Sequence, residues 1–347
     1  MPGAPATISP PPPDVPPPDD VQPRGDRPVL RLILANVTFF LCLLLALSLI
    51  GHLLRDRAVW LALLMDLPLL PIALAAALLD LARRGRSIPR ARFVLMVVAL
   101  AAAVWSFGQM TGRGPDLRRS PAPPLTVLQW NTQWGGPGGD PTWALTADAI
   151  AAQAPDIVVL NEAPTGPALD QLCRRLGRTW TIAWRENAPG SPYWYRIAVA
   201  SRWRVVLERE VSVPNGAAIA VLIEPPDAPP LRVLAVDGVS DPRVPRTPML
   251  SAVLDYCRLQ SHANRPIDVI AGDFNTVSTS VGFDHYERNY FRLASGRCTG
   301  WRGTFPSVLP LYDIDHIWLG PRLRPVSCRM LSSGSTDHRG QAAVVER

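Results

Sequence analysis

Three apolar runs in the first third of the chain limit what this sequence can fold into. They are residues 32–54, residues 58–81 and residues 93–107 or 93–110. A helix of about 20 apolar residues crosses a hydrocarbon core about 30 Å thick. We therefore predict three transmembrane helices within residues 29–111. The alternative for the first run is a cleaved signal peptide, but the run is too long and no small-residue cleavage site follows it before Arg55.

The second run differs from the other two because it contains Asp66, Pro68 and Pro71, with Asp80 near its end. Membrane helices tolerate proline where neighbouring groups satisfy the freed backbone, so we predict a kinked span. An aspartate inside a membrane is by default a functional group. Asp66 lies within about two turns of the Arg57 end of the span, which favours a position at the membrane interface.

The placement of arginine predicts the orientation of these helices. All 35 basic residues are arginine, because the chain contains no lysine. The densest cluster lies between the second and third runs, and it consists of Arg83, Arg84, Arg86, Arg90 and Arg92. Arginine-rich loops stay in the cytoplasm. We therefore predict a multi-pass protein of the cell membrane with a cytoplasmic N-terminus and a C-terminal domain on the exterior side.

Composition divides the rest of the chain into three parts. Residues 1–28 are rich in proline and have few large apolar side chains, so we expect a disordered tail. Residues 112–124 are rich in Gly, Pro and Arg and read as a short linker. Residues 125–347 then form one domain.

The cysteines leave two alternatives open. Cys42 lies in an apolar run, while Cys173, Cys257, Cys298 and Cys328 lie in the polar two-thirds, and no CxxC spacing indicates zinc. These four would pair as disulfides outside the cell or stay free thiols inside it. For an exterior domain we expect pairing, with Cys298 and Cys328 as the first choice because each lies close to a strand in the C-terminal half.

Residues 125–347 show short apolar stretches separated by turn residues, which is typical of strands. Strands are predicted at 125–130, 156–160, 196–201, 218–223, 232–236, 268–271, 314–319 and 342–345, and helices at 141–154, 170–176 and 248–259. Strands outnumber helices, and helices lie between some of them. This order predicts an α+β fold in which two packed sheets are covered by helices.

Polar side chains adjoin the predicted strands at five places. They are Asn131, Asn161 with Glu162, Asp273 with Asn275, Asp315 with His316, and Asp337 with His338. We expect one strand to break at Gly272, so that the carboxylate of Asp273 and the carboxamide of Asn275 project from one point. Such a pair can hold a phosphate, orient a water molecule or bind a hard cation. The alternative is an Asp/Asn turn that closes a strand.

Taken in order, these stretches resemble the motifs of the endonuclease/exonuclease/phosphatase family, which has the deoxyribonuclease I-like fold. The similar stretches are residues 128–131, 156–162, 197–202, 272–275, 303–306, 314–317 and 336–338. The resemblance covers residues 125–347. It implies a two-layer β-sandwich flanked by helices, with the site residues converging at one end.

The resemblance also implies a metal site. Glu162 would be the principal metal ligand, and Asn131 and Asp337 would complete the metal or phosphate site. Oxygen donors of this kind suit Mg²⁺ or Mn²⁺. No organic cofactor is expected.

Four further residues take catalytic roles by the same resemblance. His338 would be the general base that activates water, and Asp315 would hold its imidazole by a hydrogen bond. Asp273 would orient the water or the leaving group, and Asn275 would bind a phosphoryl oxygen. His316, beside Asp315, is expected to be a packing or substrate-side residue.

One position departs from the family pattern. The family usually has a histidine at the end of the strand 233–236, where it donates to the scissile phosphate, and this chain has Asp237. A carboxylate cannot donate unless it stays protonated or binds a metal. Three interpretations follow: Asp237 is a second metal ligand, Arg243 or Arg246 supplies the positive charge, or activity is weak or lost.

Together these observations predict a membrane-anchored, divalent-metal-dependent phosphoesterase. Its substrate class stays open between nucleic acids and phospholipid headgroups. The net charge of +6 is modest, and part of it comes from arginines beside the predicted membrane helices, so it is weak evidence for a nucleic-acid partner. The alternative is a non-catalytic binding or sensory module that keeps the fold. The Trp-rich segment 192–203 is either core or substrate rim, and we favour core.

The topology can be tested with reporter fusions. A reporter that folds only outside the cytoplasm should be active when it is fused after Arg119, because the predicted third span would carry it across. The same reporter fused between the second and third runs should be inactive. Fusions after Arg119 that work only as cytoplasmic reporters would contradict the orientation.

Overall fold

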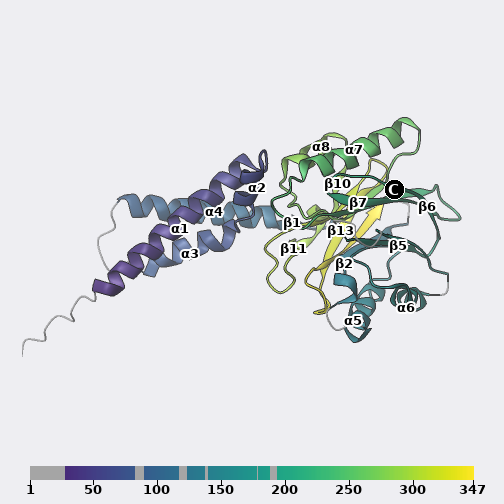
Figure 1. Cartoon of the computed structure of the whole chain (residues 1–347), viewed down its shortest axis with the longest axis horizontal. Helices are drawn as coiled ribbons and strands as arrows, with labels where there is room; N and C mark the ends of the chain where they lie inside the picture. The colour runs from purple at the N-terminus through teal and green to yellow at the C-terminus, as the bar shows by residue number, and fades with distance from the viewer. Residues whose placement is uncertain (1–27, 83–89, 117–122, 137–139, 178, 188–193) are drawn as a thin grey trace, which may run out of the picture. The chain divides into compact units, whose positions relative to one another are not determined.

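The computed structural model describes residues 28–347 apart from residues 83–89, 117–122, 137–139, 178 and 188–193 (Figure 1). Nearly all of the predicted tail, residues 1–28, therefore lies outside the described residues. The chain divides into two compact units, Met1–Phe40 and Leu41–Arg347. The second unit contains both large sheets and all the candidate site residues.

Four helices precede the sheets. They are α1 (Pro28–Leu54), α2 (Val59–Met65), α3 (Leu69–Ala82) and α4 (Arg90–Met110). Among the described residues, two segments are long and apolar enough to cross a membrane, Leu32–Leu54 and Phe93–Met110. Helices α2 and α3 are bent by 54° and count as a third span only if the pair is taken as one. The break between them contains Asp66 and Pro68, where the sequence predicts a kink.

Small side chains let three of these helices pack closely within the second unit. Leu45 of α1 is buried with residues of α3 and α4, among them Ala73, Ala76, Ala99 and Ala103. Large apolar side chains on the other faces are exposed, including Leu53 at 66% and Val104 at 72%. An apolar surface of this extent is typical of contact with lipid.

Two six-stranded sheets form the C-terminal domain (Figure 1). One sheet has the strand order β10-β12-β9-β8-β7-β6, and the other has the order β13-β14-β2-β3-β5-β4. The strands of the first sheet are β6 (Arg204–Val211), β7 (Gly216–Glu224), β8 (Leu231–Gly238), β9 (Val269–Asp273), β10 (Arg292–Leu293) and β12 (Asp315–Leu319). Those of the second are β2 (Leu125–Asn131), β3 (Ile157–Asn161), β4 (Thr181–Glu186), β5 (Arg196–Ser201), β13 (Arg324–Leu331) and β14 (Gly340–Glu346).

Alternation along the strands places one apolar face between the sheets and another under helices. Along β8, Val233 and Ala235 belong to the core between the sheets, whereas Leu234 and Val236 pack under helix α7. The covering helices are α7 (Thr247–His262) and α8 (Asp284–Arg288) on the first sheet, and α5 (Asp140–Ala151) and α6 (Gly166–Leu176) on the second. The predicted two-layer sandwich flanked by helices is therefore confirmed.

Strand direction decides where the site lies. Strands β2 and β3 are parallel and pair Asn131 with Asn161. Strands β8 and β9 are also parallel and pair Asp237 with Asp273. Because the carboxyl ends of parallel strands meet at one edge of a sheet, each sheet delivers polar side chains to one end of the sandwich.

The structure contains elements that the apolar pattern did not predict. Strands β4, β6 and β13 lie outside the predicted ranges, because much of each strand is only half-buried or exposed. Strand β9 does not break at Gly272 and runs on to Asp273, because Gly272 takes a φ of 154° that brings its backbone against Val236. A Cβ there would lie 1.8 Å from the carbonyl oxygen of Val236.

The start of the predicted linker is also ordered. Strand β1 (Thr111–Arg113) pairs antiparallel with β11 (Thr299–Trp301). Gly112 permits the close approach, since a Cβ there would lie 2.1 Å from the carbonyl oxygen of Cys298. Backbone pairing thus joins the end of α4 to the C-terminal domain, which glycine-rich composition alone does not reveal.

A disulfide joins Cys298 to Cys328, as predicted. The free cysteines are Cys42, Cys173 and Cys257. The bridge lies beside the β1–β11 pair, where Gly114 donates its backbone N–H to the carbonyl oxygen of Cys298. Disulfides persist in oxidising compartments, and the sequence predicts this pairing for that case.

Thiol counting checks the bridge. Denatured, unreduced chain should show three reactive thiols, and reduced chain should show five. The Cys298→Ser and Cys328→Ser double variant should lose about 3–4 kcal/mol of stability, because the bridge closes a loop with a sequence separation of 30. A Cys173→Ser variant serves as the control, and five reactive thiols before reduction would contradict the bridge.

Candidate active site

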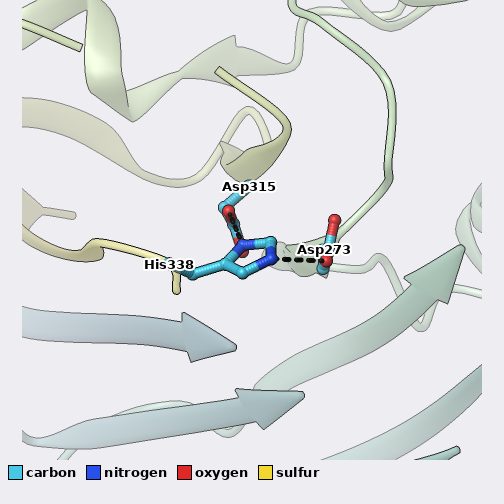
Figure 2. A group of neighbouring side chains, drawn as sticks. All are labelled: Asp273, Asp315 and His338. Carbon is cyan, nitrogen blue, oxygen red and sulfur yellow. Dashed lines mark hydrogen bonds and ion pairs between the residues drawn. The ribbon is translucent and has the colours of Figure 1, made fainter. Parts of the chain in front are cut away.

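His338 and Asp315 form a buried pair at the end of the sandwich. The Nδ1–H of His338 donates to Oδ2 of Asp315 over 2.8 Å, because a carboxylate can only accept. The opposite nitrogen, Nε2, lies 3.8 Å from Oδ2 of Asp273 (Figure 2). The imidazole therefore lies between two carboxylates and is held in one orientation.

The charged side chains of this group shift one another's pKa values. Burial alone would lower the pKa of His338, but the carboxylates of Asp315 and Asp273 outweigh it and raise the pKa to about 10. Burial would raise the pKa of Asp315, yet the charge and hydrogen bond of His338 hold it below its usual range. In this state the pair is an imidazolium and a carboxylate.

Surrounding side chains hold Asp315 and His338 in place. Gln129 donates through Nε2 to Oδ1 of Asp315 over 2.9 Å, and Gln341 donates to the carbonyl oxygen of Asp315. The Phe305 ring packs on the imidazole of His338 with centroids 4.9 Å apart. These contacts leave the imidazole little freedom to rotate.

Asn131 connects two further carboxylates. Its Nδ2 donates to Oδ2 of Asp273 over 2.9 Å and to Oε1 of Glu162 over 3.2 Å. Burial and the charge of Asp315 raise the pKa of Asp273 to about 7, although His338 and Asn131 oppose the shift. Asp273 is thus a carboxyl group whose protonation changes near neutral pH.

Glu162 follows β3 with a backbone φ of 43°, a left-handed conformation that ends the strand and turns the chain into the site. Burial raises the pKa of its carboxyl, and the negative charges of Asp337 and Asp315 add to the shift. Asn131 and His338 oppose it. Asp337 is half-buried. Of the predicted metal ligands, Asn131 and Glu162 are in direct contact, and Asp337 is near enough for its charge to act on Glu162.

Asp237 lies in the same cluster, beside Asp273 in the register of β8 and β9. It is 9% exposed. Burial raises its pKa well above the usual carboxyl range, and the charges of Asp273 and Glu162 add to the shift. An uncompensated buried carboxylate is costly, so this position requires a proton or a cation.

The donor set fits a hard divalent cation. Glu162, Asp237, Asp273 and Asp337 offer carboxylate oxygens, which are donors that Mg²⁺ and Mn²⁺ prefer. Asn131 turns its Nδ2 to Glu162 and Asp273, and its Oδ1 accepts the backbone N–H of Gln133 over 3.0 Å. Ligand atoms of Asp273, Asp315 and His338 also lie within 4.8 Å of one another. The direct Asp315–His338 hydrogen bond occupies Nδ1, so this trio is better described as an acid–base group.

Asn275 adjoins the cluster. Its backbone N–H donates to Oδ1 of Asp273 over 2.8 Å, and its Nδ2 donates to the carbonyl oxygen of Gly238 over 2.8 Å. The carboxamide carries two hydrogens, so the predicted binding of a phosphoryl oxygen is compatible with this contact.

His316 is a packing residue. It is buried, its Nε2 lies 2.7 Å from the carbonyl oxygen of Thr276, and its ring contacts the rings of Phe274 and Phe283. It points to the helix-covered face of the sheet, whereas its neighbour Asp315 points into the site.

The Trp-rich segment divides between core and surface. Arg196–Ser201 forms the buried strand β5, whereas Trp194 is 70% exposed. Trp194 packs 5.2 Å from the ring of Trp134, whose backbone N–H donates to the carbonyl oxygen of Glu162. Core was therefore the right prediction for the strand and wrong for Trp194, while residues 192–193 lie outside the described part.

Two buried glutamines were missed as supporting residues, and Asn161 was named at a strand end without a role. Gln129 and Gln341 pair across β2 and β14 and both reach Asp315. Asn161 accepts the backbone N–H of Asp273 and donates to the carbonyl oxygen of Val236. The available signal was a glutamine at a core position inside each of two apolar strands.

Comparison with known families decides the relationship. A model of the endonuclease/exonuclease/phosphatase family matches residues 128–338, more than half of the chain. The chain belongs to this family. Members of the family are hydrolases that act on phosphoester bonds. A comparison with curated protein sequences gives no match.

Solved structures agree on the fold. The catalytic domain of human nocturnin, solved with a sulfate anion, is 20% identical with a TM-score of 0.51, covering 67% of this chain and 95% of its own. A mannosyl-6-phosphatase from Bacteroides thetaiotaomicron is 15% identical with a TM-score of 0.51, covering 64% and 100%. An AP endonuclease from Leishmania major is 12% identical with a TM-score of 0.50, covering 70% and 95%. Identities this low show a shared fold alone.

Replacing Asp237 tests its place in the cluster. Its raised pKa means that the ionised carboxylate destabilises the folded state, increasingly as pH rises above the ordinary carboxyl range. Asp237→Asn should therefore raise the melting temperature of the full chain in chelator at pH 7–8. Saturating Mn²⁺ at about 100 times its dissociation constant should stabilise the wild type by roughly 2.7 kcal/mol, and the variant by less at the same concentration.

The exposed Asp255 on α7 provides the matched control, since Asp255→Asn should change neither melting temperature. If Asp237→Asn leaves both temperatures at the wild-type values, Asp237 is not part of the metal site.

Proposed function

We propose that this chain is a membrane-anchored, divalent-metal-dependent phosphoesterase whose catalytic domain lies on the exterior side of the membrane. The observation that carries the proposal is the imidazole of His338 held between Asp315 and Asp273, beside the ligand set around Glu162. The disulfide and the apolar helices support the location. Relatives of the same fold are named as a phosphatase and an endonuclease.

In this proposal His338 takes a proton from the attacking water at Nε2, while Asp315 fixes the tautomer through Nδ1. The role requires a neutral imidazole, so the charges that raise its pKa must be offset in the working enzyme. Asp273, at Nε2, orients the water, and Asn275 positions a phosphoryl oxygen. A divalent cation held by Glu162, Asn131 and Asp337, with Asp237 as a further carboxylate, would neutralise charge that develops on the phosphate.

Hydrolysis of bis(p-nitrophenyl) phosphate by the detergent-solubilised full chain tests the proposal. Activity should require Mg²⁺ or Mn²⁺ and disappear in chelator. His338→Asn should lower kcat/KM by about 10²–10⁴-fold, the usual contribution of a general base. The exposed His285 gives the matched control, since His285→Asn should leave kcat/KM unchanged. Equal activity of the two variants would contradict the role of His338.

A second function, a binding or sensory module without catalysis, is favoured by one observation. Asp237 occupies the position where the family pattern has a proton-donating histidine. If the wild type is inactive with every metal while Asp237→His gains metal-dependent turnover, the non-catalytic function is supported. Turnover by the wild type rejects it.

A further inference from the structure

A cavity of about 570 Å³ lies beside the catalytic group, and neither the fold nor the chemistry above requires it. This volume is within the range of about 300–1,000 Å³ typical of small-molecule sites. One wall comes from α2 and another from the loop before α7. Its apolar lining includes Val59, Ala62, Met65, Val244, Pro245 and Ile314.

Two residues join this cavity to the catalytic group. Asn275 lines it and donates its backbone N–H to Asp273. Phe305 lines it and packs on the imidazole of His338. A phosphoester whose phosphoryl oxygen is bound by Asn275, as proposed above, would therefore have its substituent at the entrance of the cavity.

The α2 wall is fixed to the catalytic domain by polar contacts. Arg55 donates to both carboxylate oxygens of Asp284, over 2.8 and 2.7 Å. Asp56 accepts the backbone N–H of Val281 over 2.8 Å, and Tyr312 donates its hydroxyl to the carbonyl oxygen of Asp66 over 2.8 Å. The wall is thus built from residues more than two hundred positions apart in the sequence, and its shape is defined by those bonds.

The lining combines apolar and charged side chains, which suits an amphiphilic ligand. Arg57 and Arg246 contribute positive charge to the cavity, and they are matched in number by the two aspartates that line it. These are Asp56 and Asp66, and Asp56 is engaged with Val281 and Ser280. The same wall continues from Leu54, the end of a helix apolar enough to cross a membrane.

We propose that this cavity holds the apolar chain of a membrane phospholipid-type substrate while its phosphoester lies at Asp273 and His338, a substrate class that rests on the phosphoesterase function proposed above. The occupant is a membrane lipid because apolar walls beside a membrane helix fit an alkyl chain. A nucleic-acid strand would present sugars and charges to those walls.

Alkyl phosphates of increasing length test the proposal on the full chain in lipid nanodiscs. Hexyl, octyl and decyl phosphate are measured as inhibitors of bis(p-nitrophenyl) phosphate hydrolysis and are titrated calorimetrically with Mn²⁺ present. Burying one methylene contributes about 0.8 kcal/mol, so affinity should rise about tenfold for each added pair of methylenes. Calorimetry measures the binding of alkyl phosphates even if no hydrolysis occurs. Failure of the proposed function is therefore distinguishable from failure of this inference.

A matched pair of tryptophan variants separates the cavity from partition into the bilayer. Val59 lines the cavity and is 38% exposed, whereas Leu63, one turn further along α2, is 40% exposed and is not among the described lining residues. Val59→Trp should abolish the gain with chain length, while Leu63→Trp should keep the gain. An equal gain in both variants, or no gain in the wild type, would overturn the proposal.

Discussion

Three aspartates occupy paired positions on neighbouring strands at one end of the first sheet, because the register sets Asp273 opposite both Asp237 and Asp315. Burying carboxylates so close together is costly unless cations or protons compensate them. His338 compensates Asp315 directly and Asp273 partly. In the proposed function a divalent cation compensates the charge around Asp237 and Glu162, and the proposed chemistry depends on this imbalance.

Amide side chains convert that cluster into a fixed arrangement. Asn161 bonds to the backbone of Asp273 and of Val236, and Gln129 bonds to both Asn161 and Asp315. These bonds cross from one sheet to the other, so the sandwich and the site share their geometry. A buried polar network of this kind stabilises a unique arrangement most when its members are satisfied together. Among the described residues, the Oε1 atoms of Gln129 and Gln341 are buried without a hydrogen-bond partner.

Contacts of several kinds attach the helical segment to the C-terminal domain. The β1–β11 pair, the adjacent Cys298–Cys328 bridge and the Arg55–Asp284 ion pair lie at different points of the fold. Together they fix α2 and the end of α4 against the domain. The cavity beside the site exists because of this attachment, which links the proposed membrane anchor to the choice of substrate.

Apolar periodicity was sufficient to predict most strands of the sandwich and several of its covering helices, since a strand buried on both faces reads as a short apolar run. The resemblance to the family supplied the roles of the candidate site residues, which stay predictions. The half-exposed strands β4, β6 and β13 were not predicted, because their charged faces break that apolar pattern. The pairing of Gln129 with Gln341, the position of Asp237 beside Asp273 and the cavity between Val59 and Val244 depend on register and on packing between distant segments. A slip of one residue in any of these strands would turn the same side chains to the opposite face, and no local pattern in the chain specifies that choice.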